Sequence, residues 1–367
     1  MNDDFPDAFP RLHAEIERGF ERKLHRGLQL YVSLNGQIVV DYAVGEARPD
    51  QPMTTNTINR WLSSGKPITA VAIAILKQQG SIDWSDPVKQ HLPEFAGEQI
   101  TIKNLLNHTS GLPKVELGWP DRPWADIIAA VCETRPEAAP GSIAAYQPAA
   151  TWFLLGEIIQ RISGQSFSDF VHQSICEPLG MTDSHNGMSP ATWNDYGDRI
   201  GMTWARRRAK LEDLPSHSQL HCTAPSPGGN FRGPIRELGR FYEMLLSAKT
   251  ANQPNPAGLL QKSTIDELTS RHREDMLDHT FQHKIDFGLG FIIDSNHHGA
   301  ETVPYGFGRR SSSQTFGHGG AESSSAFADP AHRLVVAWVA NVRAGEGRHQ
   351  TRNRAINSAI YEDLGLG

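Results

Sequence analysis

Segments with the pattern of β-strands lie near both ends of this 367-residue chain, and helical patterns fill its middle. Near the start, apolar residues alternate on both sides of Asn35-Gly36, which predicts a β-hairpin over 28–45. Further strands are expected at 57–61, 288–294, 314–318, 324–328 and 334–341. Because the strands come from both ends, we expect one mainly antiparallel sheet whose helical middle is inserted between its halves.

The expected fold class is therefore α/β. Residues 1–60 and 281–367 are expected to form the sheet region together, and 61–280 a mostly helical region, with the active site at their junction. The stretch 188–229 has little apolar periodicity and is expected to be irregular. Helices are expected over 9–23, 64–79, 101–107, 151–163, 167–175, 234–247 and 351–364.

The composition excludes several classes of protein. With 38% hydrophobic and 21% charged residues, the chain has the make-up of an ordinary globular protein. A net charge of -6 gives no electrostatic reason to expect nucleic acid or an anionic membrane as partner. No apolar run approaches the roughly 18 residues of a membrane span. The N-terminal residues lack the pattern of a secretory signal, so we expect a cytoplasmic protein. Cys132, Cys176 and Cys222 lie far apart, which favours buried, reduced thiols.

Ser63 and Lys66 stand three residues apart at the expected start of a helix, so both side chains leave the same side of its first turn. Pro67 supports this start, because a first-turn proline gives up only an N–H group that has no intrahelical partner. The helix N-terminus disfavours a protonated lysine, and a lysine of lowered pKa can take the proton of a serine nucleophile. About one S-x-x-K arises by chance in a chain of this size, so the motif alone does not define a site.

Further motifs follow Ser63 in order along the chain. They are 102–113 (IKNLLNHTSGLP), Pro140-Gly141 shortly before Tyr146, 154–159 (LLGEII), 177–181 (EPLGM), Gly228-Gly229, 287–290 (FGLG), 317–321 (GHGGA) and Asp329-Pro330. In this order the chain resembles the serine β-lactamase and penicillin-binding-protein family. The resemblance is to the branch that contains class C β-lactamases, D-alanyl-D-alanine carboxypeptidases and family VIII esterases. It implies a β-lactamase/transpeptidase-like fold.

The resemblance also implies catalytic roles. Ser63 would be the nucleophile of an acyl transfer, and Lys66 and Tyr146 would move its proton. Tyr146 matches the tyrosine of the family's second motif, and its phenolate would become accessible beside an ammonium group.

His318, Gly319 and Gly320 take the place of the family's K-T-G motif, in the variant that carries histidine. A protonated or hydrogen-bonding imidazole there would orient a substrate carboxylate or carbonyl. By the same analogy, the N–H groups of Ser63 and Ala321 would form the oxyanion hole.

One position departs from the family pattern. Where members often have Y-x-N, this chain has Tyr146-Gln147-Pro148, and proline cannot supply the asparagine amide that helps to hold a substrate amide. We therefore expect an esterase that acts on small carboxylic esters by acyl-enzyme formation, with water or a second alcohol as acceptor. Two alternatives stay open: a β-lactamase or D-alanyl-D-alanine peptidase, and a non-catalytic descendant of the fold that binds a ligand or partner.

The remaining motifs indicate no other chemistry. His217 and His221, like His279 and His283, are four residues apart but lack the glutamate of H-E-x-x-H, so we expect surface histidines. His108 is expected to belong to a turn, and no G-x-S-x-G, phosphate loop or dinucleotide fingerprint occurs. We assign no residue to a metal or cofactor and expect a small-molecule substrate. The sequence leaves the oligomeric state open.

Overall fold

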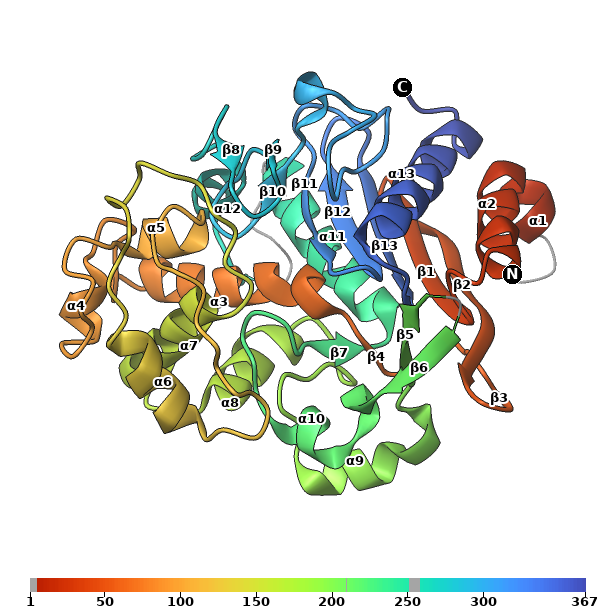
Figure 1. Ribbon diagram of the computed structural model, residues 1–367. Helices are drawn as coiled ribbons and strands as arrows, with labels where there is room; N and C mark the ends of the chain where they lie inside the picture. The colour runs from red at the N-terminus through yellow and green to blue at the C-terminus, as the bar shows by residue number, and fades with distance from the viewer. Residues whose placement is uncertain (1–4, 209, 251–257) are drawn as a thin grey trace.

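Seven strands form one sheet in the order β10-β11-β12-β13-β1-β2-β3, and each neighbouring pair is antiparallel. The computed structural model describes residues 5–208, 210–250 and 258–367 (Figure 1). The strands of this sheet are β1 (Gly27–Leu34), β2 (Gln37–Arg48), β3 (Gln51–Pro52), β10 (Ile292–Ile293), β11 (Phe316–Gly320), β12 (Ser324–Asp329) and β13 (Leu334–Ala340). The antiparallel sheet built from both ends of the chain confirms the expected α/β fold class.

The hairpin of β1 and β2 turns where its sequence predicts. Asn35 and Gly36 have φ angles of 54° and 76°, the left-handed values that a two-residue hairpin turn requires. On the far side, β1 pairs with β13 over seven residues, from Leu28 opposite Ala340 to Leu34 opposite Leu334. The first and last strands of this sheet in chain order, β1 and β13, therefore lie side by side near its centre.

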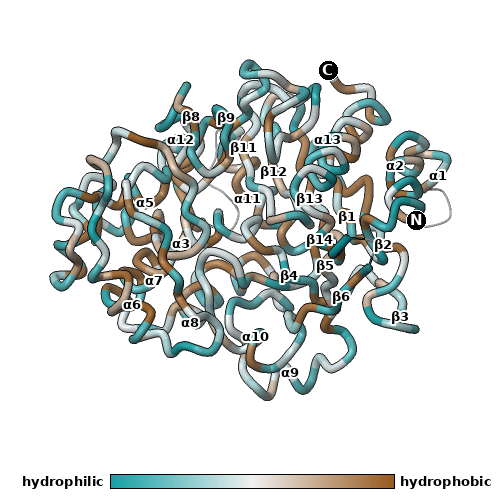
Figure 2. The backbone as a smooth tube through the Cα atoms, in the orientation of Figure 1, coloured by the Kyte–Doolittle hydropathy of each residue, from teal (hydrophilic) through white to brown (hydrophobic). Residues whose placement is uncertain are grey.

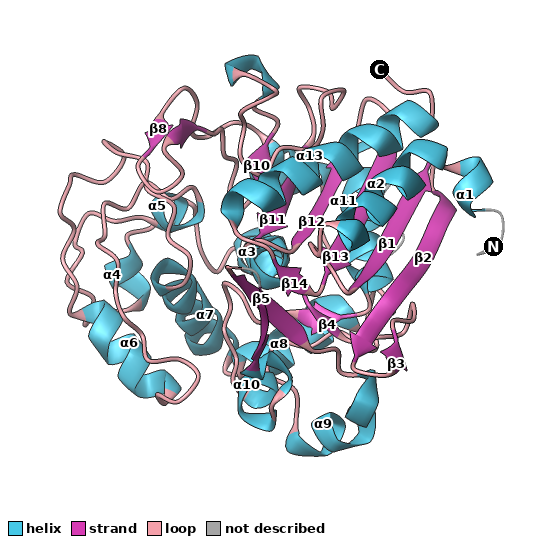
Figure 3. Cartoon of the chain, turned by 45° about the vertical axis from the view of Figure 1, so that its right-hand side comes forward, coloured by secondary structure: helices cyan, strands magenta, loops and turns pink. Residues whose placement is uncertain are grey.

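Helices cover both faces of the sheet (Figure 3). On β13, Val336 and Trp338 face the cluster that includes α2 and α13, whereas Val335 and Ala337 face the cluster around α11. This explains the unbroken apolar sequence of β13, because a strand buried on both faces has no solvent side. The helices are α1 (Phe5–Ala8), α2 (Pro10–Glu21), α3 (Lys66–Gln78), α4 (Val88–His91), α5 (Ile102–Leu106), α6 (Trp124–Cys132), α7 (Ala150–Ser163), α8 (Phe167–Val171), α9 (Pro190–Tyr196), α10 (Gln219–Thr223), α11 (Ile235–Thr250), α12 (Lys262–Thr269) and α13 (Glu346–Asp363).

Helix α3 runs through the inserted part of the chain and is buried along most of its length. Its residues 66–76 are all buried, and it contacts α7, α8 and α12. In Figure 2 the outer helix α2 is mainly hydrophilic, whereas apolar residues gather around α7. Because packing surrounds α3, its N-terminal residues are held rigidly at the edge of β11. None of the described helices is both long and apolar enough to cross a membrane.

The prediction that residues 188–229 are irregular is wrong in part. It contains α9, α10 and an antiparallel hairpin of β5 (Thr203–Arg207) and β6 (Lys210–Leu214), although residue 209 lies outside the described residues. A short strand β14 (Val342–Arg343) pairs with β5 in parallel. Most side chains of this hairpin, and all those of α9, are at least partly exposed, so no apolar periodicity marks them. The expected strand at 288–294 is also shorter, because Gly290 (φ 81°) bends the chain before β10.

Candidate active site

The turn before α3 places Ser63 at the edge of the sheet. Residues 62–65 form a short 3₁₀ turn, η1 (Leu62–Gly65), that leads directly into α3. Leu62 has a φ of 53°, which is uncommon for a residue with a side chain and marks a sharp change of direction. Two strands of two residues, β4 (Asn59–Arg60) and β7 (Arg232–Gly233), pair just before the turn and anchor it. Ser63 is thus presented by a rigid, strained segment.

Lys66 begins α3, and its side chain is completely buried beneath Ser63. Its Nζ lies 3.2 Å from Ser63 Oγ and 2.7 Å from the carbonyl oxygen of Pro148, and it also bonds to the carbonyl oxygen of Gly228. Burial, with the nearby Arg60 guanidinium as a second cause, holds the pKa of Lys66 well below its usual value. The structure therefore favours a neutral amine at this position.

Tyr146 lies on the other side of Ser63. The ring of Tyr146 is 5.4 Å from Lys66 Nζ and 5.9 Å from the ring of His318, measured to the ring centroids. Burial is the largest cause and raises the pKa of Tyr146, a hydrogen bond with the Ser63 side chain opposes that rise, and the carboxylate of Asp278 adds a smaller rise. A neutral phenol is therefore favoured, and the phenolate that the sequence suggested is disfavoured by this environment.

Buried groups hold Tyr146 in place from behind. Asp278 Oδ1 accepts a hydrogen bond from the Tyr146 N–H at 3.2 Å, and Asp278 is itself paired with buried Arg273 at 3.0 Å. The hydroxyl of Thr280 donates to the Tyr146 carbonyl at 3.0 Å. His108, in a left-handed conformation at φ 59°, accepts a hydrogen bond through Nδ1 from the Gln147 N–H at 3.2 Å. His108 thus lies in a turn, as predicted, and supports the tyrosine segment.

His318, on β11, is buried and faces the same space. Its Nδ1 lies 2.7 Å from the Gly319 carbonyl, which can only accept, so this nitrogen carries the hydrogen and Nε2 carries a lone pair. In the described part of the chain, Nε2 has no hydrogen-bond partner. Burial, followed by the charge that Lys66 carries when it is protonated, lowers the pKa of His318 to about 3. The protonated imidazole considered from the sequence is therefore not populated near neutral pH, and the hydrogen-bonding form is favoured.

Gly319 and Gly320 have no room for a side chain. A Cβ on Gly319 would collide with the Tyr305 ring, and one on Gly320 would collide with the Trp61 carbonyl. At Gly320 this close approach brings β11 against the turn that carries Ser63. Ala321 follows at the end of the strand, and its N–H makes no backbone hydrogen bond within the described residues.

A cleft of about 400 Å³ opens above these groups. Ser63, Tyr146, His318, Gly319 and Ala321 line it, whereas Lys66 lies beneath it. The structure thus brings the residues singled out in the sequence into one place. The cleft is completed by Pro148, Thr280, Phe281, Tyr305, Glu346 and Gln350.

Two features of the site were missed in the sequence. Ser64 is fully buried, and its hydroxyl donates to the His318 carbonyl at 3.1 Å and lies 2.9 Å from the Ser324 hydroxyl, so it joins η1 to β11 and β12. Glu346, the first residue of α13, accepts a hydrogen bond from the Tyr305 hydroxyl at 2.5 Å at the cleft. The second serine of the Ser-Ser pair was a visible signal for Ser64, whereas no motif marks Tyr305 or Glu346.

The comparisons with known proteins agree with this geometry. The family model described as Beta-lactamase matches residues 13–360. The chain therefore belongs to the Beta-lactamase family, a family of serine hydrolases that share this fold.

Among curated relatives, Penicillin-binding protein 4* of Bacillus subtilis (strain 168) is 33% identical over 175 residues. That match covers 44% of this chain and 39% of the relative, so the chain spans about two fifths of the relative's length. A solved structure described as EstCE1, a hydrolase with promiscuous acyltransferase activity, superposes with a TM-score of 0.81 at 19% identity, covering 96% of this chain and 98% of the other. A family VIII carboxylesterase gives a TM-score of 0.77 at 22% identity, covering 97% and 98%. At these identities the two structures show the shared β-lactamase fold.

Proposed function

We propose that this protein is an esterase that cleaves small carboxylic esters through an acyl-enzyme on Ser63. The observation that carries the proposal is the buried Lys66 amine, whose Nζ lies 3.2 Å from Ser63 Oγ and bonds to two backbone carbonyls. A neutral amine has two hydrogens and one lone pair. Because the carbonyls of Pro148 and Gly228 take the two hydrogens, the lone pair is left for the Ser63 hydroxyl. Lys66 is then the general base.

We propose a proton path that uses Ser63, Lys66 and Tyr146. Ser63 Oγ attacks the ester carbonyl carbon while its proton moves to Lys66 Nζ. The neutral Tyr146 hydroxyl gives its own proton to the departing alkoxide and regains one from Lys66. The bond between carbonyl carbon and leaving oxygen breaks, and an ester between the acyl group and Ser63 remains. Water, or a second alcohol, then attacks this ester by the reverse of the same steps.

The N–H groups of Ser63 and Ala321 are proposed to stabilise the negative charge on the carbonyl oxygen. The proposal is supported by the position of both residues at the cleft and by the Ala321 N–H, which makes no backbone hydrogen bond within the described residues. His318 Nε2, a buried acceptor, would accept a hydrogen bond from the incoming water or alcohol. Water and alcohols carry an O–H that can donate to this nitrogen, whereas a substrate carboxylate has no hydrogen to donate.

The charge of the cleft favours esters over β-lactams and D-alanyl peptides. Pro148 offers no side-chain amide for a substrate amide, and its carbonyl is already used by Lys66. Among the described residues that line the cleft, Glu346 is the one acidic side chain, and there is no lysine or arginine. A penicillin, a cephalosporin or a D-alanyl terminus carries a carboxylate, which would meet Glu346 without a cation to pair with.

The first test compares substrates on one preparation. We expect kcat/KM for p-nitrophenyl acetate or butyrate to exceed that for nitrocefin by about tenfold, because a missing hydrogen bond typically costs about 0.5–1.5 kcal/mol, each 1.4 kcal/mol is tenfold in rate, and the charge of Glu346 acts in the same direction. Glu346→Gln should reduce the ratio of kcat/KM for the ester to kcat/KM for nitrocefin. The substitution removes the negative charge that repels the nitrocefin carboxylate, and the glutamine side chain still offers an oxygen as hydrogen-bond acceptor. If nitrocefin is the better substrate by tenfold, the esterase proposal is replaced by a β-lactamase.

The rate should depend on pH through Lys66. A base must be unprotonated, so kcat/KM rises as pH passes the pKa of Lys66, and the lowering of that pKa by burial moves the rise well below the usual lysine range. His318, with a pKa of about 3, adds no further step between pH 5 and 9. We expect a rise on the acid side followed by a plateau, measured with a p-nitrophenyl ester. A monotonic fall from pH 5 upward, or a rise only above pH 10, would contradict Lys66 as the base.

A non-catalytic binding protein is the competing function. A covalent serine probe followed by mass spectrometry distinguishes the two. Labelling of Ser63 supports the esterase, whereas no labelling and no turnover of either substrate would leave the binding function as the better account.

A further inference from the structure

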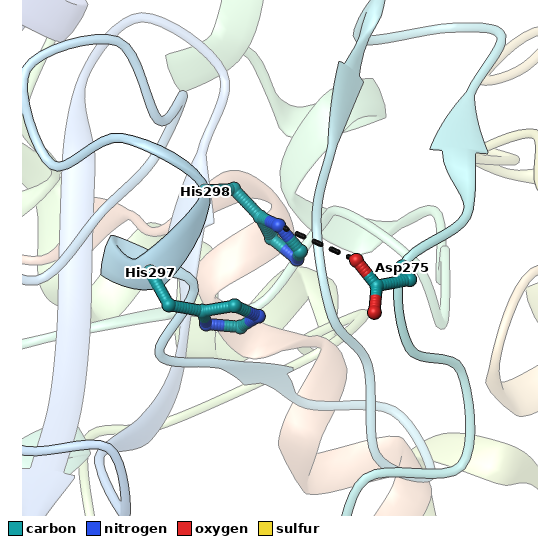
Figure 4. Close-up of side chains that lie close together, drawn as sticks. All are labelled: Asp275, His297 and His298. Carbon is teal, nitrogen blue, oxygen red and sulfur yellow. Dashed lines mark ion pairs between the residues drawn. The ribbon is translucent and has the colours of Figure 1, made fainter.

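Three side chains from two separate loops meet on the surface beside the β8–β9 hairpin, formed by β8 (Leu277–Asp278) and β9 (His283–Lys284). Asp275 precedes β8, and His297 and His298 belong to the short 3₁₀ turn η5 (Asn296–His298). Their ligand atoms all lie within 4.8 Å of one another. In Figure 4 both imidazole rings point toward the Asp275 carboxylate. We propose that Asp275, His297 and His298 bind one divalent transition-metal ion of the zinc type.

His298 is prepared for metal binding by its surroundings. Its Nε2 lies 3.1 Å from Oδ1 of Asp286, a fully buried carboxylate that also accepts from Arg271 Nε at 3.0 Å. The carboxylate can only accept, so Nε2 carries the hydrogen and Nδ1 presents its lone pair. A carboxylate behind a histidine is the usual second layer of a metal site, because it fixes the ring and its tautomer.

The lone pair of His298 Nδ1 faces the proposed ion. Only 7% of this side chain is exposed, and Nδ1 makes no hydrogen bond with any described residue. Its nearest acidic neighbour is Asp275 Oδ1 at 3.7 Å, which is too long for a hydrogen bond. A free nitrogen lone pair that lies 3.7 Å from a carboxylate oxygen, which is also an acceptor, forms a pair of ligand atoms that a cation can join.

His297 and Asp275 complete an open set of ligands. The two imidazole rings have centroids 3.7 Å apart, so His297 brings a second nitrogen to the same place. Its side chain is 47% exposed and that of Asp275 is 67% exposed, which leaves room for water as a further ligand. Lys284 pairs with Asp275 at 3.2 Å, but it is half exposed and can turn to solvent.

The ligand types select the ion. Two imidazole nitrogens and one carboxylate oxygen suit Zn²⁺ and its neighbours among the transition metals. Ca²⁺ and Mg²⁺ prefer six or more oxygen ligands and are not expected here.

Binding at this site would also stabilise the rear of the cleft. Asp275 is three residues before Asp278, which bonds to the Tyr146 N–H, and the same loop carries Thr280 and Phe281 into the cleft. An ion held by Asp275 and the two histidines joins this loop to η5. We expect it to raise thermal stability, whereas no step of the ester chemistry passes through it.

The test measures zinc directly. Protein treated with a chelator and dialysed is titrated with ZnCl₂ at pH 7.5, and bound metal is measured by elemental analysis after removal of free ion. We expect about one ion per chain for the wild type. The double variant His297→Gln/His298→Gln should lose this ion, with at least about tenfold weaker binding. Wild type with Zn²⁺ should also show a raised Tm, because the ion binds the folded chain preferentially.

A matched control removes two other histidines. His279→Gln/His283→Gln changes the same number of imidazoles on the neighbouring hairpin and should keep both the ion and the Tm shift. Single His297→Gln, at a half-exposed position, serves if the double variant does not fold. Co²⁺ should give visible absorption bands typical of nitrogen ligation with the wild type, and these bands should be absent with His297→Gln/His298→Gln.

Equal zinc uptake by the two double variants, or no uptake by the wild type at micromolar zinc, would overturn the proposal. Neither result depends on whether esters are cleaved.

Discussion

Ser63→Ala is expected to abolish acyl-enzyme formation and to lower kcat/KM for p-nitrophenyl esters by at least about 10³-fold. The variant lacks the oxygen that attacks the carbonyl carbon. The N–H groups proposed to stabilise the oxyanion can then assist only the direct attack of water on the ester. Its Tm should stay within about 1–2 °C of the wild type, because Ser63 lines an open cleft and contributes little to packing. The measurements are ester hydrolysis, mass spectrometry with a serine probe, and thermal unfolding.

Ser64→Ala is the matched control and should show the opposite pattern. Its hydroxyl is buried and bonded to the His318 carbonyl, so its loss is expected to cost about 1–2 kcal/mol and lower the Tm by about 1–3 °C. Ser63 remains in this variant, and the probe should still label it. Turnover that survives in purified Ser63→Ala, or labelling lost only in Ser64→Ala, would place the nucleophile elsewhere.

Lys66→Met is expected to lower the rate of acyl-enzyme formation by at least about 10³-fold. Methionine fills a similar volume in the buried pocket but cannot accept the Ser63 proton. It leaves the carbonyls of Pro148 and Gly228 without their donor, which should cost about 1–3 kcal/mol for each. The removal of a buried amine partly offsets this cost. Burst kinetics with a p-nitrophenyl ester separates acylation from the later hydrolysis.

Lys77→Met provides the comparison within the same helix. Lys77 lies near the end of α3 and pairs with Glu267 at 2.7 Å, away from the cleft residues. It should keep nearly full activity with a stability loss below about 1 kcal/mol. If both lysine variants lost activity alike, the effect would be due to damage to α3. If Lys66→Met retained acylation, another group would be the base.

Much of the fold could be predicted because its signals are local. Asn35-Gly36 marks the hairpin turn, Gly80 follows the end of α3, and Gly164 in a left-handed conformation ends α7. The hairpin of β5 and β6 was missed because its side chains are mostly exposed, so apolar and polar residues do not alternate along its strands. Local patterns report burial, so an element that buries little leaves no pattern.

The residues of the candidate site also divide into those that a sequence motif marks and those that have no local signal. Ser63, Lys66, Tyr146 and His318 were found because a motif places each of them. Glu346 reaches the cleft only because α13 begins there, which is a consequence of tertiary packing.

The proton states could not be read from the sequence either. They depend on how deeply Lys66 and His318 are buried, and burial lowers the pKa of both. The proposed metal ligands could not be recognised from the sequence, because the pattern that indicates a metal site there is a pair of histidines four residues apart on one helix. His297 and His298 are adjacent, and their carboxylate partners come from another loop.

The pairing of β1 with β13 has a consequence for biosynthesis. The Gly27 N–H donates to Asn341 Oδ1 at 2.9 Å, and the two residues are 314 positions apart in the sequence. The ribosome must therefore release almost the whole polypeptide before the central pair of strands can form, and contacts this distant in sequence are slow to close. His318 and the glycines beside it emerge late as well, so a nascent chain holds Ser63 without the strand that completes its cleft. The reactive serine gains its partners only once translation is nearly finished, and until then the exposed apolar face of β1 is a natural target for a chaperone.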